Sequence, residues 1–211
     1  MNTNNIEINT QSSIRINMGK ILYFDPFKIN DKKCDADIIL ITHDHYDHFD
    51  IDSINNIKND NTIIIAPNSI KDKFDNIKCN NYIFLNPNEE INIDNINIKT
   101  ILSYNNQKQF HPREKNYLGY IVTYNNITYY IAGDTDNTKE AQNVKCDIAL
   151  IPIGGYYTMD INDASNLLRV INPKVVIPTH YGSIIGNTND GEKLKELLSD
   201  TKIEVVEKLH F

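Results

Sequence analysis

The chain has 211 residues, enough for one domain of ordinary to large size, or two small ones, with a core that needs no disulfide or metal support. Its hydrophobic fraction of 40% and charged fraction of 23% are typical of a soluble globular protein. The formal net charge of -7 argues against nucleic acid as a partner, because phosphate binding requires clustered Lys and Arg.

The cysteines and the N-terminal sequence indicate in which cellular compartment the protein is expected. Cys34, Cys79 and Cys146 are odd in number, scattered, and form no CxxC pair. The simplest interpretation is three reduced thiols in a reducing cytosol. The N-terminus lacks the basic and apolar regions of a signal peptide, and no apolar run approaches the ~20 residues of a membrane span. We therefore expect a cytoplasmic protein that makes no membrane contact.

The first part of the chain is dominated by short apolar runs that turn residues separate. An isoleucine every third residue predicts a short amphipathic helix over residues 50–58, and a one- to two-turn helix is expected over 69–74. The run at 37–41 is continuously apolar, as in a strand buried on both faces. Strands are predicted over residues 13–17, 20–24, 37–41 and 62–66.

The rest of the chain continues with strands and then alternates them with helices. A polar loop is expected over residues 104–116, and helices over 163–171 and 191–198. Strands are predicted over residues 82–85, 90–93, 96–102, 118–124, 127–132, 147–151, 174–178 and 202–206. This order favours an α/β fold in which two sheets lie between helices, with the chemistry at one edge.

The most informative segment is ITHDHYDHF, directly after the strand predicted at 37–41. It contains His43, His45, Asp47 and His48, so half of the six histidines in the chain lie within six residues. Imidazole and carboxylate are ligands of zinc and other first-row metals. The alternatives are a His-rich surface loop or histidines satisfied in the core, and the clustering makes both less favoured than metal binding.

Three further residues follow predicted strands or lie in the central loop. Asp134 belongs to a Gly-Asp-Thr turn, His180 follows the strand at 174–178, and His111 lies in the polar loop. Taken singly, each has an ordinary structural interpretation as a turn, core or surface residue. His210 has no such context and is left unassigned.

Together these motifs resemble the metallo-β-lactamase superfamily. The resemblance rests on the order HxHxDH, His, GDT, and His after a strand, and it extends over nearly the whole chain. The segments ILYFDPF, IPIGGYYTMD and VIPTHYG resemble the branch that contains the ascorbate-6-phosphate lactonase and many uncharacterised metal-dependent hydrolases. The resemblance implies a four-layer αββα sandwich that forms a single domain over residues 1–211.

The resemblance also implies a set of ligands. His43 and His45 would bind one metal with a third-motif histidine. Many relatives carry that histidine immediately after its strand, whereas this chain has residues 103–105 there and His111 is the nearest candidate. The second metal would be bound by Asp47, His48 and His180, with Asp134 bridging the two ions, and Asp25 would orient the ligand loop without touching metal.

Such a site predicts metal-assisted hydrolysis. Two divalent ions, zinc first, with manganese or iron also compatible, would share and activate a water as hydroxide and polarise the bond under attack. Asp47 would be the catalytic residue that holds this water and moves its proton. The expected substrate is a small ester, lactone or phosphoester. Candidates for substrate contact, each with a plain packing role as the alternative, are Tyr104, Asn105, Arg113, Tyr156, Tyr157, Thr158 and Tyr181.

Three other functions remain open from the residues. A nuclease or RNA-processing phosphodiesterase of the same superfamily would usually carry a basic arm or an extra domain, which this acidic chain does not show. The flavodiiron relatives have Glu in place of His45 and append a flavin domain. A metal-binding protein without catalysis would keep the same ligands. A homo-oligomer is compatible with the sequence.

Overall fold

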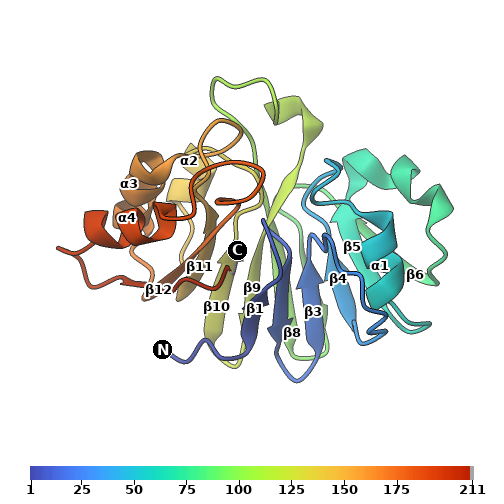
Figure 1. Cartoon of the computed structure of the whole chain (residues 1–211). Helices are drawn as coiled ribbons and strands as arrows, with labels where there is room; N and C mark the ends of the chain where they lie inside the picture. Colours follow the sequence, from blue (N-terminus) through green and yellow to red (C-terminus); the bar gives the residue numbers. More distant parts are fainter. Residues whose placement is uncertain (210–211) are drawn as a thin grey trace.

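Two β-sheets face each other, and helices cover the outer face of each (Figure 1). The computed structural model describes residues 1–209. The first sheet is antiparallel over its first three strands and parallel from β3 onward. In spatial order its strands are β1 (Ile6–Ile8), β2 (Ile14–Asn17), β3 (Ile21–Phe24), β4 (Ile38–Leu40), β5 (Ile63–Pro67) and β6 (Asn81–Leu85).

The second sheet follows the same pattern along the chain. Its first four strands are antiparallel, and β10 onward are parallel. The sheet consists of β7 (Glu90–Ile93), β8 (Ile96–Leu102), β9 (Leu118–Tyr124), β10 (Ile127–Ile131), β11 (Ile148–Pro152), β12 (Val175–Thr179) and β13 (Glu204–Val205), in the order β13-β12-β11-β10-β9-β8-β7. The parallel strands of both sheets bring loops to a common edge, where chemistry is expected in layered α/β folds.

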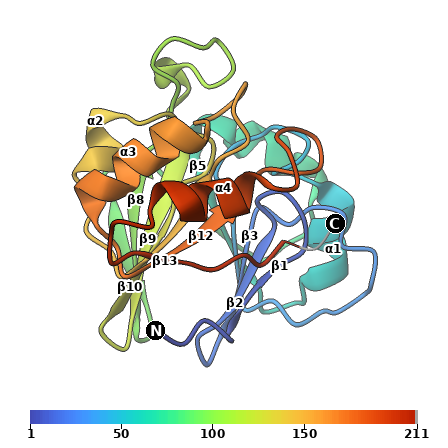
Figure 2. The same ribbon diagram turned by 60° about the vertical axis from the view of Figure 1, so that its left-hand side comes forward.

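The helices form the outer layers. One group lies over the second sheet, as Figure 2 shows from the side, and consists of α2 (Lys139–Gln142), α3 (Ile161–Ile171) and α4 (Asp190–Leu197). The other covers the first sheet and consists of α1 (Ile51–Ile57) and the 3₁₀ segment η1 (Asn68–Asn76). A further 3₁₀ turn, η2 (Arg113–Lys115), lies in the loop between β8 and β9. The four-layer αββα sandwich is therefore confirmed.

Strand β4 shows why the chain carries a continuous apolar run before its histidines. Ile38 and Leu40 pack into the core between the sheets, whereas Ile39 and Ile41 pack into the separate cluster under α1 and η1. All four side chains are fully buried. A strand covered on both faces cannot alternate apolar and polar residues, so the predicted double burial is confirmed.

Most predicted elements are present, and the differences are at short elements and ends. The sequence interpretation missed β1, α2 and η2, none longer than four residues. Helix α3 begins two residues before its predicted start, because Asp160 accepts hydrogen bonds from the amides of Asn162 and Asp163. All three cysteines are free. Among residues 1–209, no helix is long and apolar enough to cross a membrane. His210 lies outside the described residues.

Candidate metal centre

Seven predicted ligands converge at the edge where the strands of both sheets end. The cluster after β4 supplies four, and three loops of the second sheet supply the others: β8–β9, the turn after β10, and the end of β12. The seven are His43, His45, Asp47, His48, His111, Asp134 and His180. All are buried except His45, which is partly exposed to the cavity in front of the centre. The centre therefore joins the two sheets.

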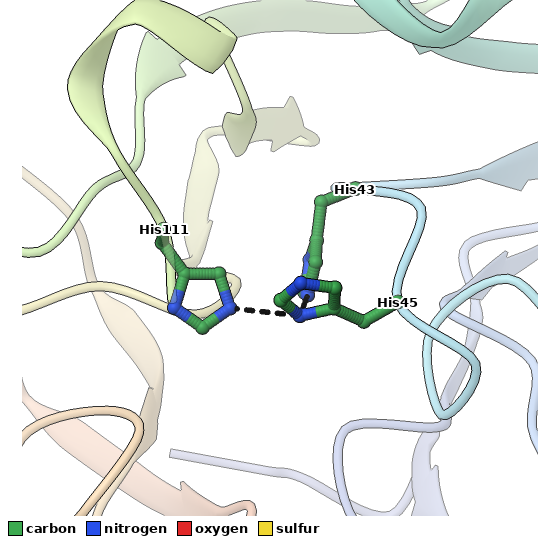
Figure 3. A group of neighbouring side chains, drawn as sticks. All are labelled: His43, His45 and His111. Atoms are coloured by element: carbon green, nitrogen blue, oxygen red, sulfur yellow. Dashed lines mark hydrogen bonds between the residues drawn. The ribbon is translucent and has the colours of Figure 1, made fainter. Parts of the chain in front are cut away.

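One half of the centre consists of three imidazoles. His45 Nδ1 lies 3.1 Å from His43 Nε2 and 3.2 Å from His111 Nε2, as Figure 3 shows. A single proton cannot satisfy three ring nitrogens that face one point, whereas a cation accepts all three lone pairs. Ligand atoms about 2.0–2.2 Å from a tetrahedral zinc lie about 3.3–3.6 Å apart, close to the spacing found here. The three histidines are therefore able to hold one metal ion.

The other half combines a carboxylate with two imidazoles. His180 Nε2 lies 3.3 Å and His48 Nε2 lies 3.8 Å from Asp47 Oδ2. These three residues form a second group able to hold an ion. The group has one carboxylate more than the first, so the two halves differ in charge.

Asp134 lies between the two halves. One of its oxygens, Oδ1, is 3.3 Å from His48 Nε2. The other, Oδ2, is 3.3 Å from His111 Nε2 and 3.4 Å from His180 Nε2. The preceding Gly133 has φ +63°, and a Cβ there would lie 3.0 Å from the Leu118 carbonyl and from the Thr42 side chain. Only glycine fits this turn without strain, and the turn directs the carboxylate between the two groups.

Hydrogen bonds on the far side of the rings fix three of the histidines. The Nδ1 atoms of His43, His48 and His111 lie 2.8–3.0 Å from oxygens of Thr42, Asp25 and Asn105, respectively. Such contacts set the tautomer and direct Nε2 to the centre.

Asp25 supports the cluster as a positioning residue. It accepts from the Thr42 amide and hydroxyl, each at 2.7 Å, and from His48 at 2.8 Å. Asp25, His43 and His48 also form a close group with metal-ligand geometry. Because both oxygens of Asp25 already accept hydrogen bonds, they are not free to act as ligands. Its backbone is left-handed, at φ +45°, a strained conformation that such contacts maintain.

Buried polar atoms without partners test whether the residues present suit a metal. Within residues 1–209, His48 Nε2, His180 Nε2 and Asp134 Oδ1 are buried and make no hydrogen bond. His48 Nε2 and Asp134 Oδ1 lie 3.3 Å apart but are not aligned as a hydrogen bond. Leaving such an atom unsatisfied costs about 1–3 kcal/mol. A cation between them would satisfy all three, so the donor set fits a metal.

The protonation states of Asp134, His43 and His45 agree with that fit, whereas the carboxylates around His48 favour its protonated form. Burial alone would raise the pKa of Asp134, but the neighbouring His180 and His48 outweigh burial and hold the pKa well below its usual range. Burial lowers the pKa of both His43 and His45, which favours neutral imidazole. For His48, burial acts in the same direction, but Asp134 and Asp25 raise its pKa above the usual value. Ionised carboxylates and neutral imidazoles are the forms that bind metal.

A cavity of about 360 Å³ opens onto the centre. Ligands from both halves line its floor, including His45, Asp47 and His180. Its walls are formed by Asp44, Tyr46, Phe110, Tyr157 and Ile184. A cavity that places a metal centre at its base can admit a small molecule to the reacting atoms.

Only some of the candidate substrate-contact residues lie at the cavity. Tyr157 lines the cavity, and Asn105 holds His111. Four others lie elsewhere: Tyr104 donates to Glu140, Arg113 pairs with Glu140, Tyr181 donates to Glu207, and Thr158 is fully buried. Tyr156 is not among the lining residues but packs on Tyr157 beside them. Arg113 thus satisfies its charge with a carboxylate of α2, and it is not among the residues that line the cavity.

Several residues of the site were not anticipated. Tyr46 and Phe110 are direct neighbours of predicted ligands, so their position in the sequence was an available signal. Ile184 had none. Gln11 is also new: its carbonyl accepts a hydrogen bond from the His180 amide at 3.0 Å, and it has a left-handed backbone at φ +49°. This bond ties the first sheet to a ligand of the second.

Comparison with known proteins places the chain in a family. The model of the "Beta-lactamase superfamily domain" family matches residues 6–180, which span every candidate ligand. The chain belongs to the metallo-β-lactamase superfamily. The predicted membership is therefore confirmed.

Relatives within the superfamily are similar over almost their whole length. A UPF0173 metal-dependent hydrolase of Methanosphaera stadtmanae is 32% identical over 200 residues, covering 86% of this chain and 85% of the relative. Another from Pyrococcus horikoshii is 30% identical over 206 residues, covering 89% and 88%. The structure of a putative metal-dependent hydrolase from Parabacteroides distasonis is 30% identical, with a TM-score of 0.83 and coverage of 97% and 93%. The chain thus groups with the metal-dependent hydrolases of the superfamily.

Proposed function

We propose that this metal-dependent hydrolase holds two divalent ions and uses them to cleave a small ester, lactone or phosphoester with water. One ion is bound by His43, His45 and His111, and the other by Asp47, His48 and His180. The observation that carries the proposal is the position of Asp134, whose two oxygens lie within 3.4 Å of imidazole nitrogens from both groups. A carboxylate in this position would be able to bind a cation held by either group, so Asp134 would complete both sets of ligands.

The metals provide the chemistry that the side chains lack. When bound, divalent ions would lower the pKa of a water toward about 7 and polarise the oxygen of the bond under attack. Zinc suits this donor set of five imidazoles and two carboxylates, and manganese or iron accept the same nitrogen and oxygen ligands. No serine, cysteine or lysine nucleophile lines the cavity among residues 1–209.

Asp47 is the proposed proton carrier. Asp47 belongs to one ligand group and also lines the cavity, so it would lie beside both the metal and a bound substrate. Burial would raise its pKa, but the close His180 imidazole and the His48 charge outweigh burial and lower it. The residue is therefore ionised at neutral pH and able to accept a proton.

The proton balance of the reaction is simple for an ester. Asp47 takes a proton as the water oxygen bonds to the carbonyl carbon. It returns that proton to the leaving oxygen as the carbon–oxygen bond breaks, and the products are an acid and an alcohol.

Metal content and turnover measured on the same preparations test the proposal. Purified protein should contain about two equivalents of metal by elemental analysis, in line with two groups of three ligands. His45→Ala should lose metal and hydrolysis together, because His45 Nδ1 faces both other imidazoles of its group. Asp94→Asn, at an exposed carboxylate paired with Lys20, is the control and should keep both. Retention of full metal content and turnover in His45→Ala would refute the assignment.

A further inference from the structure

Exposed apolar side chains gather at the mouth of the metal-site cavity. Among residues 1–209, six large hydrophobic side chains are exposed, and three of them are at this mouth: Tyr46 at 67%, Tyr156 at 66% and Ile184 at 37%. Tyr46 and Ile184 line the cavity directly. Exposing apolar surface is unfavourable, and a patch concentrated at a cavity marks a binding site rather than chance.

Aromatic rings form one wall of this mouth. The rings of Phe110, Tyr156 and Tyr157 all contact one another, with centroids 4.7–5.3 Å apart. Across the cavity mouth, the ring of Tyr46 packs edge-on against Phe27 at 5.9 Å. The rings of Tyr46, Phe110, Tyr156 and Tyr157 come from three separate loops, after β4, between β8 and β9, and after β11. None of them belongs to either core cluster, so their packing serves the mouth and not the fold.

Tyr156 is held in an unfavourable conformation. Its backbone φ is +20°, which a bulky residue rarely adopts. Its ring nevertheless remains two-thirds exposed, so no burial of that ring offsets the strain. Strained residues with exposed side chains are concentrated at ligand-binding positions.

The walls carry no positive side chain. No lysine or arginine lines the cavity in the described part of the chain, and its ionisable lining beyond histidine is acidic. Three cations near the cavity are paired with carboxylates: Lys73 with Asp44 at 3.6 Å, Lys108 with Asp136, and Arg113 with Glu140. Lys28 lies over the ring of Phe27, which is not among the lining residues. A substrate with a charged phosphate beyond the reacting bond would find no counter-charge on these walls.

We propose that the cavity takes an uncharged carboxylic ester or lactone with an apolar, preferably aromatic, acyl group, in preference to a phosphoester. The acyl group lies against the Phe110–Tyr156–Tyr157 wall and Ile184 while its carbonyl reaches the metal centre. This inference rests on the proposed hydrolytic function and narrows its substrate class. Burying an aromatic group contributes about 1.5–3 kcal/mol, equivalent to roughly 10- to 100-fold in the specificity constant.

Four-nitrophenyl compounds test the class with one chromophore. The metal-loaded full chain is assayed with 4-nitrophenyl phenylacetate, 4-nitrophenyl acetate and bis(4-nitrophenyl) phosphate. We expect kcat/KM for the phenylacetate to exceed that for the acetate by at least about tenfold, from the burial estimate above, and to exceed that for the phosphodiester. A phosphodiester preferred over the phenylacetate, or equal constants for the two carboxylic esters, would overturn the proposal.

Two variants test whether the apolar wall causes the preference for the phenylacetate over the acetate. Tyr157→Ala and Ile184→Ala should each lower the phenylacetate-to-acetate ratio by about three- to tenfold, because each removes apolar contact area. Val170→Ala is the matched control, since Val170 is an exposed apolar residue of α3 outside the cavity. It should leave the ratio unchanged. Ratios unaffected by both wall variants would contradict the assigned surface, and thermal melts identify any variant that does not fold.

A binding measurement separates this inference from the hydrolytic function. The uncharged amide 4-phenylbutanamide is not cleaved readily, and saturation-transfer NMR detects its binding without turnover. We expect saturation transfer with the wild type and Val170→Ala and its reduction in Tyr157→Ala. If no ester is cleaved but the amide binds in this pattern, the proposed function fails and the apolar site stands. If esters are cleaved without preference and the amide does not bind, the apolar site fails and the hydrolase stands.

Discussion

The floor and the mouth of the cavity are built in opposite ways. The floor is almost entirely buried, and three of its histidines are fixed by hydrogen bonds to Asp25, Thr42 and Asn105. The mouth consists of exposed and half-buried rings that pack mainly on one another, outside either core cluster. Rigid support suits groups whose geometry the chemistry dictates, whereas a loosely held apolar rim can change without loss of the centre. The contrast implies that reaction type and substrate choice are separable in this molecule.

The strongest test of the floor is Asp134→Asn. Loss of outer hydrogen-bond partners alone costs about 10–100-fold in metal affinity or activity, so loss of the bridging carboxylate should cost at least about 100-fold in kcat/KM. Elemental analysis should show metal lost from both groups, since Asp134 approaches imidazoles of each. Full activity with two bound ions would contradict the bridging role.

Metal removal should lower the thermal stability of the protein, because the cations stabilise the floor of the cavity. An ion present at 100 times its dissociation constant stabilises the folded state by about 2.7 kcal/mol. For a chain of this size that corresponds to a drop in Tm of about 5–10 °C on chelation. Thermal melts with and without EDTA, followed by re-addition of zinc, measure the effect. An unchanged Tm would mean that the buried nitrogens and oxygens are satisfied without metal.

Weakening the support of the floor should have a smaller effect than removing a ligand. Asp25→Asn keeps the shape of the side chain but replaces one acceptor oxygen by a donor, which disrupts the contacts with Thr42 and His48. We expect metal affinity to fall by about 10–100-fold with the fold retained. Competition with a metal-binding dye measures the affinity, and the surface variant Asp94→Asn provides the reference. Wild-type affinity would show that Asp25 does not position His48.

Changes at the mouth should affect stability least. Tyr156→Ala removes an exposed ring, and surface substitutions of this kind usually change the free energy of unfolding by less than about 0.5 kcal/mol. Replacing a strained tyrosine with a smaller residue makes a large loss still less expected. Chemical denaturation of the metal-loaded protein gives the value. A loss above about 2 kcal/mol would show that the ring supports the fold, and the contrast between floor and mouth would fail.

The sequence allowed more of the floor than of the mouth to be predicted. Residues 43–48 form a local pattern, and the order of the later motifs brought in Asp134, His180 and His111. The role of Asn105 was not predicted, because its bond to His111 depends on how the loop folds back. Arg113 was assigned to a possible anion contact, but tertiary packing gives it Glu140 from α2, an element too short to predict. Ile184 was not predicted either, because only the tertiary structure brings it to the cavity.

The same physical distinction applies to the secondary structure. Long apolar runs such as that of β4 are visible because burial on both faces leaves no polar position. The three-residue strand β1 contains a single pair of isoleucines around Glu7, and its structure depends on antiparallel pairing with β2. Short elements therefore rely on neighbours that a local pattern does not reveal.

The distribution of the ligands over both sheets has a consequence for assembly. His43, His45, Asp47 and His48 follow a strand of the first sheet, whereas His111, Asp134 and His180 follow strands of the second. Neither sheet alone supplies either group of three candidate ligands: the group of His43 and His45 requires His111, and the group of Asp47 and His48 requires His180. Bound metal would therefore act as a cross-link between the two sheets that forms only after they have packed. It would then resist their separation at the edge that carries the ligands.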